Sequence, residues 1–108
     1  MNLNLTDQLE QLLLQHLDKP DFAISQICGK MGYSYPHLNR IVKGETGLTL
    51  ALFVRSVRVE ASLELLEEAD KHISEIAYEV GFASPNYFTR AFREIYGVSP
   101  REWRKQQT

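Results

Sequence analysis

One short pattern occurs twice in this chain, and that internal repeat limits the folds open to it. Ile24-Ser25-Gln26-Ile27 and Gly32-Tyr33 match Ile73-Ser74-Glu75-Ile76 and Gly81-Phe82 at an offset of 49 residues, and one extra residue, Ala83, then raises the offset to 50. The pairs matched at offset 50 are Ser34 and Ser84, Leu38 and Phe88, Arg40 and Arg90, Val42 and Phe92, Lys43 and Arg93, and Gly47-Leu48-Thr49 and Gly97-Val98-Ser99. The two halves of the chain therefore have to adopt one local structure twice.

Each copy is typical of a helix-turn-helix. A short apolar-faced helix is followed by a glycine, where the backbone can turn without a Cβ clash. The second helix of each copy carries an arginine and a further basic residue, and such a helix can enter a major groove about 12 Å wide. One helix-turn-helix pattern is weakly specific, because helix corners are common in all-helical cores. Two copies with matched basic residues favour DNA binding more strongly.

Hydrophobic spacing predicts an all-α chain of seven helices and no sheet, because no window shows sustained alternation. We expect Thr6 to cap the first helix and Pro20 to stop it, Ser34 to cap the third helix, and Gly44 and Gly47 to end it. The apolar stripe of the long fourth helix is expected to include Leu52, Phe53, Val57, Ala61, Leu65 and Leu66. The expected helices are Thr6–Leu17, Ile24–Met31, Tyr35–Lys43, Leu50–Glu68, Ser74–Val80, Pro85–Tyr96 and Pro100–Lys105.

Composition excludes several classes of protein. The chain is 44% hydrophobic and 24% charged, as in ordinary globular domains. No apolar run approaches the roughly 20 residues of a membrane span, and the start has no signal-peptide pattern. The single cysteine, Cys28, allows no internal disulfide and is expected to be a buried thiol; the three histidines are dispersed. We therefore expect a small cytoplasmic domain without metal or cofactor, with no membrane contact, in which Trp103 fills the core.

The formal net charge of -2 conceals an alternation of charge along the chain. Residues 36–58 carry +3 and residues 81–108 carry +3, whereas residues 1–35 carry -2 and residues 59–80 carry -6. A ligand experiences the local field, because salt screens charges beyond about 8 Å at physiological ionic strength. The two basic blocks contain the second helix of each repeat, although charge alone is also compatible with random clustering on a solvated surface.

The second copy resembles the signature of the AraC/XylS family of transcription regulators. The residues that carry the resemblance are Gly81-Phe82, Tyr87-Phe88-x-Arg90-x-Phe92, Gly97-x-Ser99-Pro100 and Arg104, with Gly32-Tyr33-Ser34, Leu38-x-Arg40, Gly47, Arg55-x-x-Arg58, Ala61 and Leu65-Leu66 in the first half. The resemblance covers about residues 5–105. It implies a seven-helix domain made of two helix-turn-helix subdomains, residues 6–49 and 69–105, joined by a linker helix, residues 50–68.

The resemblance also implies a function. Family members regulate transcription by placing two recognition helices in successive major-groove segments of double-stranded DNA, about one helical turn apart. The sequence at Asp21-Phe22, Cys28 and residues 73–82 is most similar to the sequences of bacterial output domains from response regulators or hybrid two-component sensors. We therefore expect a sensory or receiver domain elsewhere in a longer protein, with RNA polymerase as a further partner if the protein is an activator. A stand-alone activator is the competing interpretation.

Position by position, the resemblance assigns contacts to the two recognition helices. The residues expected to read bases are Pro36, His37, Asn39 and Arg40 in the first, and Pro85, Asn86, Tyr87, Thr89 and Arg90 in the second. Those expected at phosphates are Ser34, Lys43, Ser84 and Arg93. Arginine can pair with guanine and asparagine with adenine, whereas Pro36 donates no hydrogen bond, which predicts weaker base reading by the first copy. We expect Arg55 and Arg58 to be tethers within the domain.

A second hypothesis is a helical protein-interaction module that has lost its affinity for DNA, which the acidic total charge would suit. An enzyme is a distant third, because the sequence has no catalytic motif or phosphate-binding loop. The first two hypotheses differ in salt response. Phosphate-driven binding weakens steeply as salt rises, and a protein-binding module would show no DNA isotherm.

Overall fold

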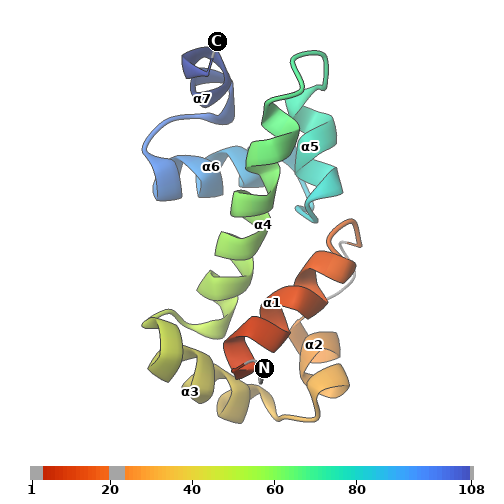
Figure 1. Cartoon of the computed structure of the whole chain (residues 1–108), viewed down its shortest axis with the longest axis vertical. Coiled ribbons are helices and arrows are strands. Elements are labelled where there is room, and N and C mark those ends of the chain that lie inside the picture. The colour runs from red at the N-terminus through yellow and green to blue at the C-terminus, as the bar shows by residue number, and fades with distance from the viewer. Residues whose placement is uncertain (1–3, 20–23, 108) are drawn as a thin grey trace. The chain divides into compact units, whose positions relative to one another are not determined.

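The computed structural model describes residues 4–19 and 24–107, and within these ranges it contains seven helices and no strand (Figure 1). The all-α prediction is confirmed. The helices are α1 (Leu5–Gln15), α2 (Ile24–Met31), α3 (Tyr35–Thr46), α4 (Leu50–Leu66), α5 (Ile73–Glu79), α6 (Pro85–Tyr96) and α7 (Pro100–Gln106). Pro20, the expected stop of the first helix, lies outside the described residues.

The structure corrects three local predictions. Asn4, not Thr6, caps α1: its side-chain oxygen accepts from the Asp7 N–H at 2.8 Å, and Thr6 lies inside the helix. Gly44 does not break α3, which continues to Thr46 because a glycine in mid-helix costs only about 1 kcal/mol. Leu52 was expected in the buried stripe of α4 but is 41% exposed. The expected stripe was misplaced there, because Leu50 and Val54 enter the core instead.

The chain divides into two compact units, and each has its own core. The first unit contains α1, α2, α3 and the part of α4 up to Val57. Its core takes side chains from all four helices. The buried members are Leu9, Leu13, Ile27, Cys28, Leu38, Val42, Leu50, Val54 and Val57. Cys28 is a buried free thiol, as expected. A bond of 2.6 Å from the Thr6 hydroxyl to Glu45 Oε2 further joins α1 to α3.

The second unit contains the rest of α4, from Arg58, together with α5, α6, α7 and residues 17–19. Its core is richer in aromatic rings than that of the first. The buried members are Val59, Leu66, Ile76, Ala77, Val80, Phe82, Phe88, Ala91 and Phe92. Trp103 of α7 packs on this core, with its ring centroid 6.4 Å from that of Phe92. Trp103 is half-buried and packs against the core that the sequence predicted it to fill.

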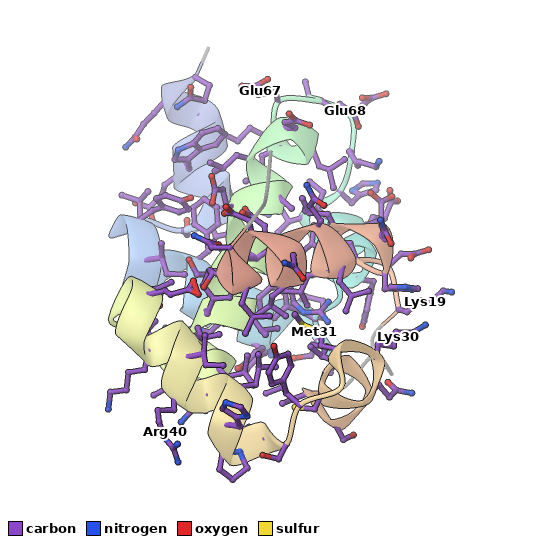
Figure 2. All side chains as sticks on the ribbon, turned by 60° about the horizontal axis from the view of Figure 1, so that its bottom comes forward. Lys19, Lys30, Met31, Arg40, Glu67 and Glu68 are labelled. Atoms are coloured by element: carbon purple, nitrogen blue, oxygen red, sulfur yellow. The ribbon has the colours of Figure 1, made fainter. Side chains whose placement is uncertain are left out.

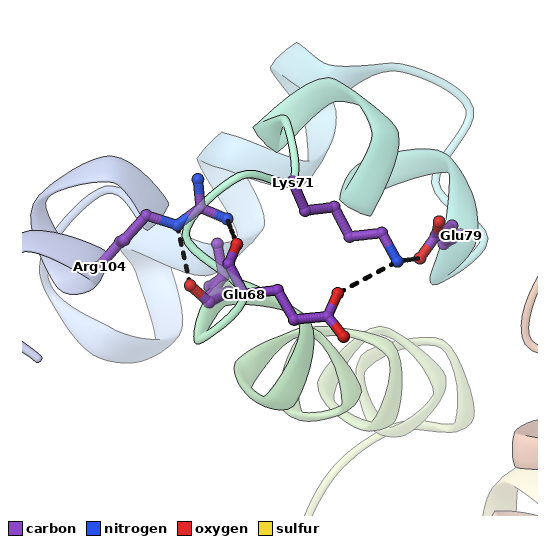
Figure 3. A network of polar contacts seen from close by, with 5 residues as sticks. Glu68, Lys71, Glu79 and Arg104 are labelled. Atoms are coloured by element: carbon purple, nitrogen blue, oxygen red, sulfur yellow. Dashed lines mark hydrogen bonds and ion pairs between the residues drawn. The ribbon is translucent and has the colours of Figure 1, made fainter.

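The linker helix α4 is not a separate piece between two subdomains, because its first half helps to form one core and its second half the other. At the end of α4, Arg104 Nε donates to the carbonyl of Leu66, the last residue of the helix, at 2.8 Å. Its Nη2 donates to Glu68 O, two residues further on, at 3.2 Å (Figure 3). Beside it, Lys71 forms ion pairs with Glu68 and Glu79 (Figure 3).

In the second unit, the turn after α5 encloses a buried guanidinium. Arg58 is 7% exposed, and its Nη1 donates to Leu17 O at 3.2 Å and to Val80 O at 3.0 Å. Burial lowers the pKa of Arg58 from its usual value. A Cβ at Gly81 would overlap Arg58 Nη1, and Gly81 also has a φ of +93°. Glycine is required there for two reasons, and Arg58 is a tether within the unit, as expected.

Candidate nucleic-acid interface

The two helix-turn-helix units are built by matching capping bonds. Ser34 Oγ accepts from the His37 N–H, and Ser84 Oγ accepts from the Tyr87 N–H, so each serine caps its recognition helix. Gly47 and Gly97 then end α3 and α6 with the same φ of +80°. These bonds explain why the serines recur at an offset of 50 residues. They leave the first-turn N–H groups that remain, and the positive end of each helix dipole, for an anion such as phosphate.

The face of α3 opposite the core is polar and basic. Leu38 and Val42 are buried, whereas Pro36, Arg40 and Lys43 are exposed. Figure 2 shows the Arg40 side chain pointing away from its helix into open space. The acidic residue of this segment, Glu45, bonds to Thr6 of α1. The outward face of α3 therefore carries two cations.

The corresponding face of α6 carries more hydrogen-bonding groups. Phe88, Ala91 and Phe92 are buried in the core. The opposite face lines an open hollow with five polar residues, which are Asn86, Thr89, Arg90, Arg93 and Glu94. Asn86, Arg90 and Arg93 are exposed, whereas Thr89 and Pro85 are half-buried. Glu94 was not predicted from sequence; the spacing of eight residues from Asn86 places it on this face.

An aromatic contact orients one residue of each recognition helix. The His37 ring meets the Tyr33 ring edge-on at a centroid distance of 5.1 Å, and the Tyr87 ring lies 5.3 Å from that of Phe82. Tyr33 and Phe82 each follow the turn glycine of their copy. Tyr87 is nevertheless 47% exposed. The Tyr87 ring therefore packs against Phe82 on one side and still presents exposed surface.

Asn39 differs from the other predicted base readers. It is half-buried, and its Oδ1 accepts from the Leu50 N–H at 2.7 Å. Leu50 is the first residue of α4. The Asn39 side chain therefore satisfies one of the N–H groups that a helix leaves without a partner at its start. Sequence reasoning missed this role, because the bond joins residues 11 positions apart across the turn between two helices.

Other candidate sites give no competing chemistry. Among residues 4–19 and 24–107, no group of three histidine, cysteine or acidic side chains could hold a metal ion. Within the same ranges, no helix is long and apolar enough to cross a membrane. Arg58 and Arg104, two of the arginines that carry the resemblance, donate to backbone carbonyls within the second unit.

Two helix-turn-helix units, each with a capped helix that exposes an arginine and a second cation, define a nucleic-acid-binding class of protein. The family model of a helix-turn-helix domain matches residues 8–106. The chain belongs to this family, which is the AraC/XylS type of transcription regulator, and its members are not enzymes.

Individual relatives agree with this assignment. A probable transcription factor, PqrA of Proteus vulgaris, is 36% identical over 94% of this chain and 84% of its own length. The C-terminal domain of AraT, a response regulator from Geobacillus stearothermophilus, is 28% identical with a TM-score of 0.83, over 96% of this chain and 86% of that domain. The DNA-binding domain of AdpA, solved with a target DNA, is 26% identical with a TM-score of 0.82, over 94% and 90% of the two chains.

The chain spans only about a third of some longer relatives. The transcriptional activator RhaR of Klebsiella pneumoniae is 31% identical over 94% of this chain, which covers 36% of RhaR.

Proposed function

We propose that this chain is a transcription-regulator output domain that binds double-stranded DNA sequence-selectively. In this proposal α3 and α6 enter successive major-groove segments about one helical turn, roughly 34–36 Å, apart. The observation that carries the proposal is the matched pair of exposed arginines, Arg40 and Arg90, each followed by a second exposed cation on the same helix face. The solved complex of AdpA with a target DNA supports it.

The roles of the side chains follow from what each can offer. Arg40 and Arg90 can form bidentate pairs with guanine, and Asn86 with adenine. His37 and Tyr87 present oriented rings, and Thr89 can contact a thymine methyl. Pro36 and Pro85 lie at the starts of their helices and offer only apolar contact.

Phosphate contacts would hold the helices in register. Lys43 and Arg93 are exposed at the next turn along each helix and suit the backbone. Ser34 and Ser84 would act through the helix starts that they cap.

The wider setting is also part of the proposal. AraT is a response regulator, and RhaR is an activator of which this chain covers only 36%, which suits an output domain controlled by a sensory or receiver domain. RNA polymerase is the further partner expected of an activator, and the cytoplasm is the compartment in which these partners meet.

Selection of random duplexes by the purified chain, at low and at physiological salt, tests the proposal. We expect enrichment of two short boxes about one helical turn apart, with affinity that falls steeply as salt rises. Absence of enrichment even at low salt would instead favour a protein-interaction module. That second candidate rests only on the acidic total charge.

Two variants of α6 separate base contacts from phosphate contacts. Arg90→Ala should weaken binding to the selected site by about 1–3 kcal/mol and relax the preference at one position. Arg93→Ala should weaken binding to all sequences alike and reduce the salt slope by about 0.9. Equal losses on all sequences for Arg90→Ala, or a site-selective loss for Arg93→Ala, would reverse the two assignments.

A further inference from the structure

The two helix-turn-helix units are matched residue by residue, and the helix that follows each of them begins with the same capping bonds. In the first unit Thr49 Oγ1 accepts from the Leu52 N–H, and the Phe53 N–H donates to Thr49 O. In the second unit Ser99 Oγ accepts from the Glu102 N–H, and the Trp103 N–H donates to Ser99 O. The starts of α4 and α7 are therefore the same motif at an offset of 50 residues.

The difference lies at the first helical residue. Leu50 begins α4, and its N–H donates to Asn39 Oδ1 at 2.7 Å. Pro100 begins α7 and has no N–H to satisfy. At the offset of 50, Asn39 corresponds to Thr89. The first copy therefore uses this position of its recognition helix to hold the next helix, whereas the second copy has no such donor at that point.

We infer that α6 sets the sequence preference of this domain and that Asn39 is a positioning residue of α3, not a base reader. This inference rests on the proposed function. To read adenine, an asparagine needs its carbonyl oxygen for the amino group and its amide N–H for N7 at the same time. Asn39 has its carbonyl oxygen engaged by a backbone donor, and breaking that bond would leave the Leu50 N–H without its acceptor.

The other residues on the outward faces of α3 and α6 support the same inference. The position of Asn86, an exposed amide on α6, is occupied in α3 by Pro36, which donates no hydrogen bond. The base-reading groups left on α3 are Arg40 and the His37 ring. On α6 they are the side chains of Asn86, Thr89 and Arg90, which line one hollow. The α3 unit thus mainly anchors the domain, and the α6 unit selects the site.

The test compares Asn39→Asp with Asn86→Asp. Aspartate keeps an acceptor for a backbone N–H but loses the amide donor that adenine recognition requires. For Asn39→Asp we expect the melting temperature of the unaltered chain, because an acidic group also suits a helix start. In random-duplex selection this variant should bind all sequences more weakly, owing to its added negative charge, with unchanged base preferences. Asn86→Asp, the matched control on α6, should lose a preference for adenine at one position.

A third variant measures the positioning role directly. Asn39→Ala removes the acceptor, and its melting temperature should fall by roughly 4–8 °C without any change in base preference. The inference is overturned if Asn39→Asp loses an adenine preference, or if Asn39→Ala has the same melting temperature as the unaltered chain. No enrichment by the unaltered chain at low salt would overturn the proposed function and this inference together, whereas an adenine preference lost with Asn39→Asp overturns the inference alone.

Discussion

Replacing Gly81 by alanine tests how the second helix-turn-helix unit is built. The new Cβ would overlap Arg58 Nη1 and lie 2.6 Å from both Arg58 Cζ and Leu17 O. The guanidinium would therefore have to leave its site and give up its bonds to Leu17 O and Val80 O. The left-handed φ of +93° adds strain for any residue with a side chain.

The repeat supplies a matched control. Gly32 corresponds to Gly81 and has a φ of +76°, but a Cβ built there meets nothing within 4 Å. Gly32→Ala should therefore cost only the backbone strain, about 1–2 kcal/mol. Gly81→Ala loses in addition two hydrogen bonds of a charged group, one buried and one part-buried, for a total of about 4–6 kcal/mol. That loss is large against the 5–15 kcal/mol by which native domains are stable.

Urea denaturation measures both variants. Trp103 is the only tryptophan and packs on the second core, so its fluorescence reports unfolding of the unit that contains Gly81. Far-ultraviolet circular dichroism follows the helices of both units. A double-mutant cycle completes the test, because Gly81→Ala in an Arg58→Ala background should lose at least about 2 kcal/mol less than in the unaltered chain. Equal losses for Gly81→Ala and Gly32→Ala, or an unchanged loss without Arg58, would refute the reasoning.

Three further predictions concern polar contacts. Arg104→Ala should lower the free energy of unfolding by roughly 1–3 kcal/mol, measured by Trp103 fluorescence, because the carbonyls at the end of α4 lose a charged donor; a neutral result would show that water replaces it fully. Thr6→Val should cost about 1–2 kcal/mol by circular dichroism, since it removes the donor to Glu45 while nearly preserving shape, and Thr6→Ser should retain most of that stability. Hydrogen bonding to Glu79 raises the pKa of Lys71, against partial desolvation, and Glu68 adds to the rise. Because a raised pKa in the folded state stabilises it below the unfolded value, any advantage over Lys71→Met should be present below pH 10.5 and fade as pH rises beyond it; an advantage that grows with pH would contradict the ion pairs.

The sequence by itself determined the number and order of the helices and the matched turns. These features depend on local rules: hydrophobic spacing at 3.6 residues, serine before a helix and glycine after it. The repeat strengthened them, because each signal occurs twice, and α2 and α6 begin and end where the spacing predicted. It also placed Arg40 and Arg90 on outward faces, since the apolar residues of the same helices define the buried side. The predicted helix boundaries were wrong where two nearby residues could both act as a cap, as at the start of α1, where Asn4 and not Thr6 is the cap.

Only the tertiary structure decided which polar residues are already in use. Asn39 and Asn86 look equally suited to adenine in the sequence, but a backbone donor 11 residues away engages Asn39. The sequence predicted Arg58 as a tether but not its acceptors, which are Leu17 O and Val80 O, and it did not indicate that Leu66 O accepts from Arg104. The reason is physical: a polar group buried on folding must find a partner, and that partner is set by how helices pack and not by neighbours in the chain.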